Sequence, residues 1–406
     1  MAGWGIRVLA ELNGIYGSAH GIVSSYSPDA PKSYRLTRLV SSCHVVVIGC
    51  DDVSGKLTDS RSCGQSVGRK PGLSMKNLIT DIAGVRVGHA DDAALASGVT
   101  AVLFDQPAVA AMDVRGGGPG TREGSLLDLA NTVEKIDAIA LSGGSAFGLE
   151  AGGGVQAWLA EQGRGFQIRE AVIPIVPGAI CFDLLNGGNK KWGRFAPYRD
   201  LGYTAAAAAG TGFALGSIGA GLGALTSTLK GGLGSASAKT SGGVSVGAIA
   251  VVNAVGSVTI GDGPWFWAAP FELNGEFGGR GQPPSFTPDM LAMRLKGGPN
   301  ATPVENTTLA VVVTDAFLSK PQARRLAMIA QTGFARAIYP VHAPLDGDVV
   351  FAAATGEKAI DPLYGLTELG MVAANVIARA IARGVYEASA LPFPGALPSW
   401  KDRFAK

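Results

Sequence analysis

The sequence is poor in the residues on which many enzyme mechanisms depend. Its 406 residues include only four cysteines and four histidines. The spacing of Cys43, Cys50, Cys63 and Cys181 fits neither a zinc site nor a disulfide framework. We therefore expect free thiols in a reducing compartment, and few candidates for a histidine base.

Charge is also scarce. Lys and Arg together number 34 and Asp and Glu 32, and the resulting net charge of +2 gives no support to a nucleic-acid partner. Because 47% of the residues are hydrophobic and 16% charged, the chain is expected to be globular. No apolar segment led by Arg or Lys opens the chain, so the cytoplasm is the expected location. Residues 203–229 are too rich in Ala and Gly to predict a membrane span.

The first 74 residues differ from the rest. They are rich in Ser, Arg and Cys and lack sustained periodicity, whereas Met75 begins a stretch that resembles a new chain start. We expect residues 1–74 to be a poorly ordered extension.

From Met75 onward, short apolar runs alternate with glycines and helical stretches, which predicts a layered α/β sandwich of undetermined strand order. One predicted helix covers 319–335, with Ser319 as N-cap and Pro321 in its first turn, and another covers 367–383. The apolar runs lie at 98–104, 138–141, 148–161, 244–252, 309–313 and 349–354.

A segment dense in Gly, Pro and polar residues, 273–307, predicts a long exposed connection. It ends directly at the apolar run Leu309 to Val313. A chain can be cut in such a loop without losing its fold.

Two common site motifs are incomplete. The glycine-rich stretch LSGGSAFGLEAGGG, 141–154, lacks the Lys-Ser/Thr of a phosphate-binding loop and the GxGxxG spacing. It fits either a strand-to-helix turn or a glycine packing cluster. Ser145 is followed at the second position by Phe147, which excludes a GxSxG nucleophile elbow.

The remaining route to an activated hydroxyl is a Ser or Thr whose own α-amine is the base. Thr307 fits this role because it follows a cleavable loop and precedes a strand that would fix its hydroxyl. A plain polar strand entrance is the alternative, and spacing alone favours it.

Two carboxylates in VHAPLDGDVVFA, Asp346 and Asp348, flank Gly347 near another predicted strand. Side chains at i and i+2 of a strand point the same way, so both could orient the Thr307 amine. An ordinary turn remains the alternative, and the pattern of a calcium-binding loop is incomplete.

Several motifs together resemble one family of self-processing peptidases, which contains the L-aminopeptidase/D-amidase/esterase enzymes, the β-aminopeptidases and the nylon-oligomer endohydrolases. The similarity covers 77–390 in order. The motifs are DVRGGGPGTRE (113–123), LSGGSAFGLEAGGGV (141–155), IPIVPGAICFDL (173–184), GAGLGA and KGGLGSAS (219–237), AVVNAVG (250–256), ENTTLAVVVTDA (305–316) and PLDGD (344–348).

The resemblance implies a four-layer αββα sandwich like that of N-terminal-nucleophile hydrolases, with different connectivity. It implies self-cleavage between Asn306 and Thr307, which would make 75–306 and 307–406 two parts of one catalytic domain. It also implies tetramers of cleaved protomers, and neither a metal nor an organic cofactor.

The resemblance also assigns site residues. Thr307 would be the nucleophile and amine base, with Asp346 and Asp348 as carboxylate partners as in the nylon-oligomer branch. Lys230 would lie near the nucleophile, and Asn253 would donate to the oxyanion. Phe182 stands where some members have tyrosine, which leaves the branch and substrate preference open.

The expected function is an amidohydrolase or aminopeptidase that cleaves amide or ester bonds of small peptides or amino-acid derivatives through an acyl-enzyme. The alternatives are acyl transfer to an amine and a noncatalytic binding protein that retains the fold.

Overall fold

The computed structural model describes residues 75–297 and 306–405. The expectation for residues 1–74 lies outside these ranges. The strands are β1 (Val85–Asp92), β2 (Ser97–Val114), β3 (Thr121–Arg122), β4 (Lys135–Ser142), β5 (Phe166–Ile168), β6 (Ala171–Ile173), β7 (Gly178–Ile180), β8 (Gly232–Lys239), β9 (Ser245–Asn253), β10 (Thr307–Ala316) and β11 (Val349–Lys358). The α-helices are α1 (Ala151–Glu161), α2 (Tyr198–Ala207), α3 (Lys320–Ala330), α4 (Thr332–Ala335), α5 (Tyr364–Tyr386) and α6 (Trp400–Phe404).

The long strand β2 joins two layers of sheet. Its first half pairs with β1 and β4, and its second half pairs with β11, in the order β3-β7-β4-β2-β11-β10-β9-β8. The register with β4 shifts between Leu103 and Ala108, around the exposed residues 105–107. Pro107 has no N–H to donate, which favours an interruption of the ladder at this point.

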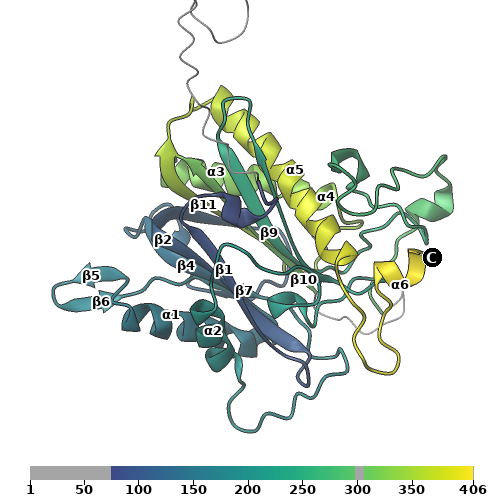
Figure 1. Ribbon diagram of the computed structural model, residues 1–406, viewed down its shortest axis with the longest axis horizontal. Coiled ribbons are helices and arrows are strands. Elements are labelled where there is room, and N and C mark those ends of the chain that lie inside the picture. Colours follow the sequence, from purple (N-terminus) through teal and green to yellow (C-terminus); the bar gives the residue numbers. More distant parts are fainter. Residues whose placement is uncertain (1–74, 298–305, 406) are drawn as a thin grey trace, which may run out of the picture. The chain divides into compact units, whose positions relative to one another are not determined.

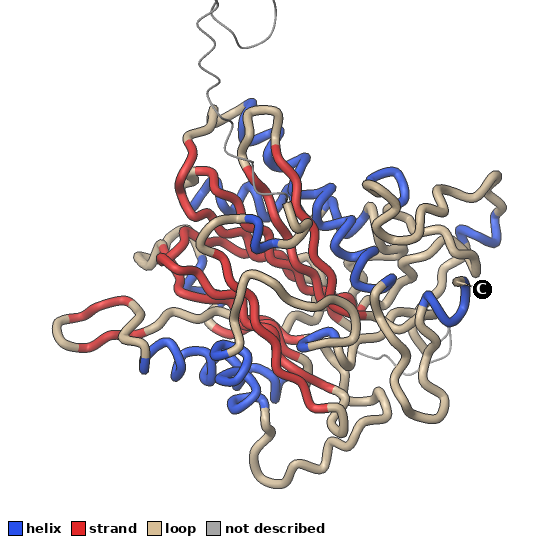
Figure 2. The backbone as a smooth tube through the Cα atoms, viewed as in Figure 1, coloured by secondary structure: helices blue, strands red, loops and turns tan. Residues whose placement is uncertain are grey.

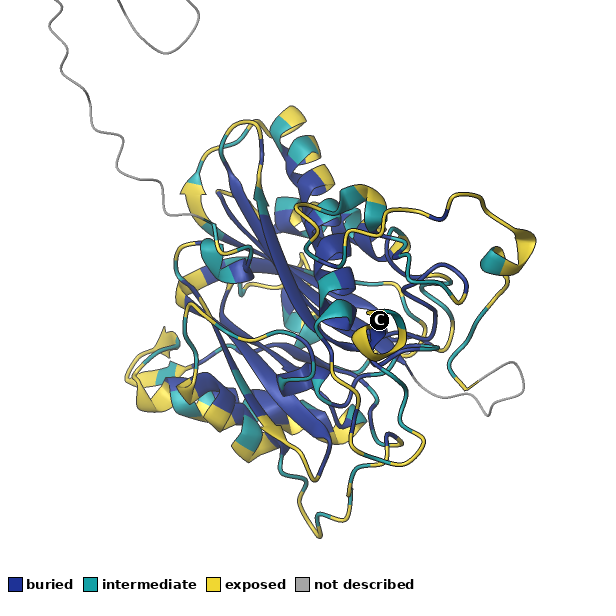
Figure 3. Cartoon of the chain, turned by 45° about the vertical axis from the view of Figure 1, so that its right-hand side comes forward, coloured by how far each residue is buried: buried dark blue, intermediate teal, exposed yellow. Residues whose placement is uncertain are grey.

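Three buried clusters separate four layers. One lies between the β8–β11 part of the sheet and helices α3, α4 and α5. A second lies between the two sheet layers, and a third lies between β1, β2 and β4 and helices α1 and α2. Figures 1 and 2 show the strands between these two groups of helices, and Figure 3 shows that the buried residues concentrate on the strands. The predicted αββα sandwich is confirmed.

The predicted elements are confirmed in place and differ at their ends. The Ser319 hydroxyl accepts a hydrogen bond from the Gln322 N–H, as an N-cap should, but the helix breaks at Gln331 into α3 and α4. The second predicted helix is the central part of α5. Within the described residues, α5 alone is long and apolar enough to span a membrane, and most of its apolar stretch is buried in the core.

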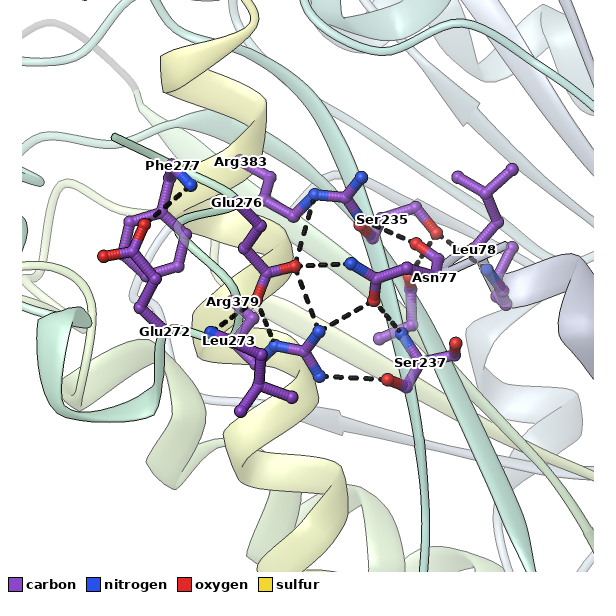
Figure 4. A network of polar contacts seen from close by, with 12 residues as sticks. Asn77, Leu78, Ser235, Ser237, Glu272, Leu273, Glu276, Phe277, Arg379 and Arg383 are labelled. Carbon is purple, nitrogen blue, oxygen red and sulfur yellow. Dashed lines mark hydrogen bonds and ion pairs between the residues drawn. The ribbon is translucent and has the colours of Figure 1, made fainter. Parts of the chain in front are cut away.

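A buried ionic network joins α5 to segments far from it in sequence. Figure 4 shows the Glu276 carboxylate between Arg379 and Arg383 of α5, with Asn77 beside it. Arg379 donates from Nε to Glu276 at 2.5 Å and from Nη2 to the Asn77 Oδ1 at 2.7 Å. Burial alone would raise the pKa of Glu276, but the bonds from Arg379 and Asn77 lower it. The network therefore connects residues on either side of the Asn306–Thr307 bond.

Candidate active site

Thr307 is the first residue of β10, and its place follows from the strand behind it. Leu309 to Val313 are fully buried, so this apolar run fixes the strand in the middle of the sheet. Leu309, Val311 and Val313 face the cluster between the two sheet layers, and alternation along the strand puts Thr307 on that same face. Thr308 faces the other way, and its buried hydroxyl has no hydrogen-bond partner among the described residues.

The peptide bond before Thr307 is held in contact with the Thr307 hydroxyl. The hydroxyl oxygen Oγ1 donates to the Asn306 carbonyl oxygen at 2.5 Å. The same carbonyl oxygen accepts the Gly347 N–H at 2.7 Å, and the Asn306 N–H donates to the Leu345 carbonyl. One backbone donor, the Gly347 N–H, therefore already binds the oxygen on which negative charge would develop if the hydroxyl attacked this carbonyl.

Gly347 is a residue that sequence reasoning did not single out. A Cβ atom at this position would lie 2.5 Å from Thr307 Oγ1 and 2.6 Å from the Gly118 carbonyl oxygen. The segment 115–118 lies against the 346–348 segment, and the Gly118 N–H donates to the Asp346 carbonyl at 2.7 Å. Only a glycine leaves space for the hydroxyl here, which the sequence alone could not indicate.

Asp346 and Asp348 flank Gly347 and are both buried. They lie just before β11 and not in a regular strand, so their carboxylates take separate partners. Asp348 accepts the Thr308 N–H at 2.9 Å, whereas Asp346 accepts the Val255 N–H at 3.4 Å. Burial, followed by the negative charge of Asp348, raises the pKa of Asp346 to about 8. Asp346 is thus kept largely protonated at neutral pH.

His342 is a second residue that sequence reasoning passed over, although it belongs to the quoted stretch around the two aspartates. Its Nδ1 lies 2.9 Å from Asp348 Oδ2, and its backbone N–H donates to the same oxygen at 3.2 Å. The ring also stacks on Phe334. His342 therefore orients Asp348, and only the folded loop brings the two together.

Asn253 lies directly opposite Thr307 in the antiparallel pair of β9 and β10. Residues paired in this way have side chains on the same face, with Cβ atoms about 4.5 to 5.5 Å apart. The Asn253 Nδ2 donates to the Phe182 carbonyl at 2.9 Å, and its Oδ1 accepts the Leu225 N–H at 3.0 Å. Phe182 thus contacts the site through its backbone carbonyl, and a tyrosine at this position would offer the same carbonyl.

Lys296 also reaches Asn253 and was not predicted. Its Nζ lies 3.0 Å from Asn253 Oδ1, and its backbone N–H donates to the Val255 carbonyl at 2.9 Å. Burial lowers the pKa of Lys296 to about 7. A lysine in a polar, glycine-rich connection carries no sequence signal that separates it from a solvated one.

Lys230 is held by backbone carbonyls. Its fully buried ammonium group donates to the carbonyls of Gly221, Ala224 and Gly231 at 2.8 to 3.1 Å. These three acceptors use all its hydrogens. Burial lowers the pKa of Lys230 to about 7. Lys230 thus holds the turn before β8 and pairs with Leu225, whose N–H binds the Asn253 side chain.

The described residues include no group of three or more His, Cys, Asp or Glu side chains that could hold a metal ion. The reactive groups at this point are a threonine hydroxyl, two carboxylates, an asparagine amide and a lysine. In such a set the hydroxyl can attack a carbonyl, a neighbouring group can take the hydroxyl proton, and the amide can stabilise the resulting oxyanion.

Comparisons with known proteins identify the family of this chain. The model of peptidase family S58 matches residues 77–395. An uncharacterized aminopeptidase of Mycobacterium tuberculosis is 45% identical over 347 residues, which cover 81% of this chain and 98% of the relative. A 6-aminohexanoate-oligomer endohydrolase of a Kocuria species is 28% identical over 317 residues, 74% of this chain and 84% of the relative.

The fold has a solved counterpart. The L-aminopeptidase D-Ala-esterase/amidase of Ochrobactrum anthropi, described as a variant of the N-terminal-nucleophile hydrolase fold, superposes with a TM-score of 0.59. It is 20% identical, and the match covers 80% of this chain and 91% of that one. The family resemblance predicted from the motifs is thus confirmed: the chain belongs to peptidase family S58 and is a hydrolase of peptide bonds.

Proposed function

We propose that this chain is a precursor that cuts its own Asn306–Thr307 bond and then uses Thr307 as the N-terminal nucleophile of an aminopeptidase or amidase. One observation supports this most strongly. The Thr307 hydroxyl lies 2.5 Å from the Asn306 carbonyl oxygen, which also accepts the Gly347 N–H. The hydroxyl and one backbone donor therefore already contact the carbonyl group that self-cleavage would attack.

The self-cleavage step is an N-to-O acyl shift. Thr307 Oγ1 forms a bond to the Asn306 carbonyl carbon, the C–N bond to Thr307 breaks, and the hydroxyl proton ends on the released nitrogen. Water then hydrolyses the ester, which restores the hydroxyl and leaves Asn306 with a carboxylate. The products are chains of 306 and 100 residues.

The second chain would begin with a free Thr307 amine beside Asp346 and Asp348. That amine takes the proton from Oγ1 as the hydroxyl attacks a substrate carbonyl, and the proton passes to the leaving amine or alcohol. Water then releases the acyl group from the ester. Relatives named for aminopeptidase, amidase, esterase and 6-aminohexanoate-oligomer cleavage support a small amide or ester substrate.

The neighbouring threonine provides a matched control. Thr307→Ala removes the nucleophile, while Thr308→Ala removes a buried hydroxyl that has no partner among the described residues. We expect Thr307→Ala to abolish both cutting and hydrolysis of aminoacyl p-nitroanilides, and Thr308→Ala to retain both. N-terminal sequencing of the smaller chain should begin at Thr307. Hydrolysis that persists in Thr307→Ala would refute the proposal.

A further inference from the structure

Asn253 is the side chain opposite the nucleophile, and its orientation depends on Lys296. The Asn253 Oδ1 accepts from two donors, the Leu225 N–H at 3.0 Å and the Lys296 Nζ at 3.0 Å. An amide nitrogen could not accept from either donor, so these partners fix which end of the carboxamide is oxygen. The Nδ2 atom must then point away from Lys296.

The Nδ2 atom carries two hydrogens, and the Phe182 carbonyl accepts one at 2.9 Å. Because Asn253 and Thr307 are directly opposed on β9 and β10, the other hydrogen is close to any carbonyl that the hydroxyl attacks. A cation at Oδ1 draws electron density from the amide and makes its N–H groups stronger donors.

We propose that Lys296 is a positioning residue for hydrolysis: its ammonium group holds and polarises the Asn253 amide, so that this amide stabilises the oxyanion formed at Thr307. The inference rests on the proposed function and adds to it a residue from the segment that precedes the cut. In the uncut chain, the Gly347 N–H is a second donor to a carbonyl oxygen at this point, because it donates to the Asn306 carbonyl.

Lys296 can keep this role after the cut. Its backbone N–H donates to the Val255 carbonyl at 2.9 Å, two residues beyond Asn253 and independent of the Asn306–Thr307 bond. It precedes that bond by ten residues and so stays in the first chain. Lys296 would therefore bring a residue of the first chain to the active site of the cut enzyme.

The test uses Lys296→Met, which keeps the stem of the side chain and removes its charge, and Lys296→Arg, which keeps a cation. Arg294→Met is the matched control, because Arg294 lies on the same segment and pairs with Asp262 and Asp289 instead. In the cut enzymes we expect Lys296→Met to lower kcat about tenfold with KM nearly unchanged, below the 10²- to 10³-fold cost of losing an oxyanion donor outright. Lys296→Arg should restore most of kcat, and Arg294→Met should match the wild type.

A double-mutant cycle separates positioning from a general structural effect. In an Asn253→Ala background, Lys296→Met should cost less than about twofold, because the amide through which it acts is absent. Full additivity, or a Lys296→Met kcat within about twofold of the wild type, overturns the inference while leaving self-cleavage and hydrolysis by the wild type intact. A wild-type chain that neither cuts nor hydrolyses defeats the proposed function as well. If Lys296→Met stays uncut, the uncut precursors are compared. The role is then supported if Lys296→Arg cuts and Lys296→Met melts at the wild-type temperature. It is overturned if Lys296→Met melts at a lower temperature and Lys296→Arg does not restore cutting.

Discussion

The Gly347 N–H donates to the Asn306 carbonyl oxygen at 2.7 Å, so the residue between the two site carboxylates touches the peptide bond that precedes Thr307. The same glycine lies against the Thr307 hydroxyl. In the proposed self-cleavage, this one glycine would stabilise the developing oxyanion and leave the Thr307 hydroxyl room to move.

Gly347→Ala should therefore slow self-cleavage. The added Cβ would lie 2.5 Å from Thr307 Oγ1 and must displace either the hydroxyl or the Gly118 backbone. We expect at least about a tenfold slower appearance of the cut chains by mass spectrometry, since a misplacement of about 1 Å can cost 10²-fold in rate. Gly242→Ala, where a Cβ meets only the Thr240 hydroxyl at 3.9 Å, is the control and should cut at the wild-type rate. Equal rates for the two variants would contradict the steric role of Gly347.

Asp346 should make the stability of the uncut protein depend on pH. Burial raises its pKa from 3.8 to about 8, so the folded protein binds more protons than the unfolded chain between these values. The stability contributed by the protonated group is complete below about pH 4 and is lost as the pH rises to about 8. In a Thr307→Ala background, Asp346→Asn should gain stability over its parent as the pH rises, by at least about 1.4 kcal/mol, the value of one pKa unit. Urea unfolding at pH 5 and pH 8 measures this, and a difference that stays constant with pH would contradict it.

Glu276 should contribute strongly to stability because its carboxylate lies between the buried Arg379 and the partly buried Arg383. Its side chain is 8% exposed and that of Arg379 4% exposed. In a Thr307→Ala background, Glu276→Ala should lower the free energy of unfolding by about 3 to 5 kcal/mol, because it leaves buried positive charge without a partner. Glu150→Ala breaks the exposed pair with Arg199 and should cost less than about 1 kcal/mol. Similar losses for both variants in denaturant unfolding would show that the network does not hold α5 in place.

The residues just after Met75 should be needed, whatever the role of residues 1–74. The Asn77 amide joins the Glu276 network, and the Ile79 N–H donates to Ser235 at 2.8 Å. A chain that begins at Met75 is therefore expected to fold and cut, whereas one that begins at Ile82 should melt at a lower temperature. Circular dichroism melting and mass spectrometry of both chains test this. Loss of folding in the chain that begins at Met75 would show that the first 74 residues are not a dispensable extension.

The sequence predicts well what depends on local patterns. The apolar run behind Thr307 indicates a buried strand, Ser319 and Pro321 indicate a helix start, and both lie where expected. The glycine-rich stretch after β4 is a strand-to-helix turn, and its glycines also let α1 pack closely on α2: a Cβ at Gly154 would lie 1.9 Å from the Arg199 carbonyl oxygen. The order of the strands and the register shift between β2 and β4 depend on long-range pairing and could not be read from the sequence.

The site was only partly predictable for the same reason. Thr307, Asp346 and Asp348 are singled out by the family motifs, whereas spacing alone left a plain strand entrance and a turn as alternatives. Gly347, His342 and Lys296 act through contacts that exist only after folding. The family resemblance places Lys230 near the nucleophile, and the sequence does not reveal that three carbonyls occupy its ammonium group. Motifs identify reactive groups, whereas the groups that orient them come from other parts of the fold.

The mass of the purified protein tests self-cleavage at Thr307 most directly. During incubation, intact-mass spectrometry should show the wild-type protein converting to two chains. The first should end at Asn306 and the second begin at Thr307, and together they should weigh one water more than the precursor. Thr307→Ala should keep the precursor mass throughout. A wild-type chain that stays whole, or a Thr307→Ala chain that splits at the same bond, would contradict the proposal that Thr307 cuts the bond before it.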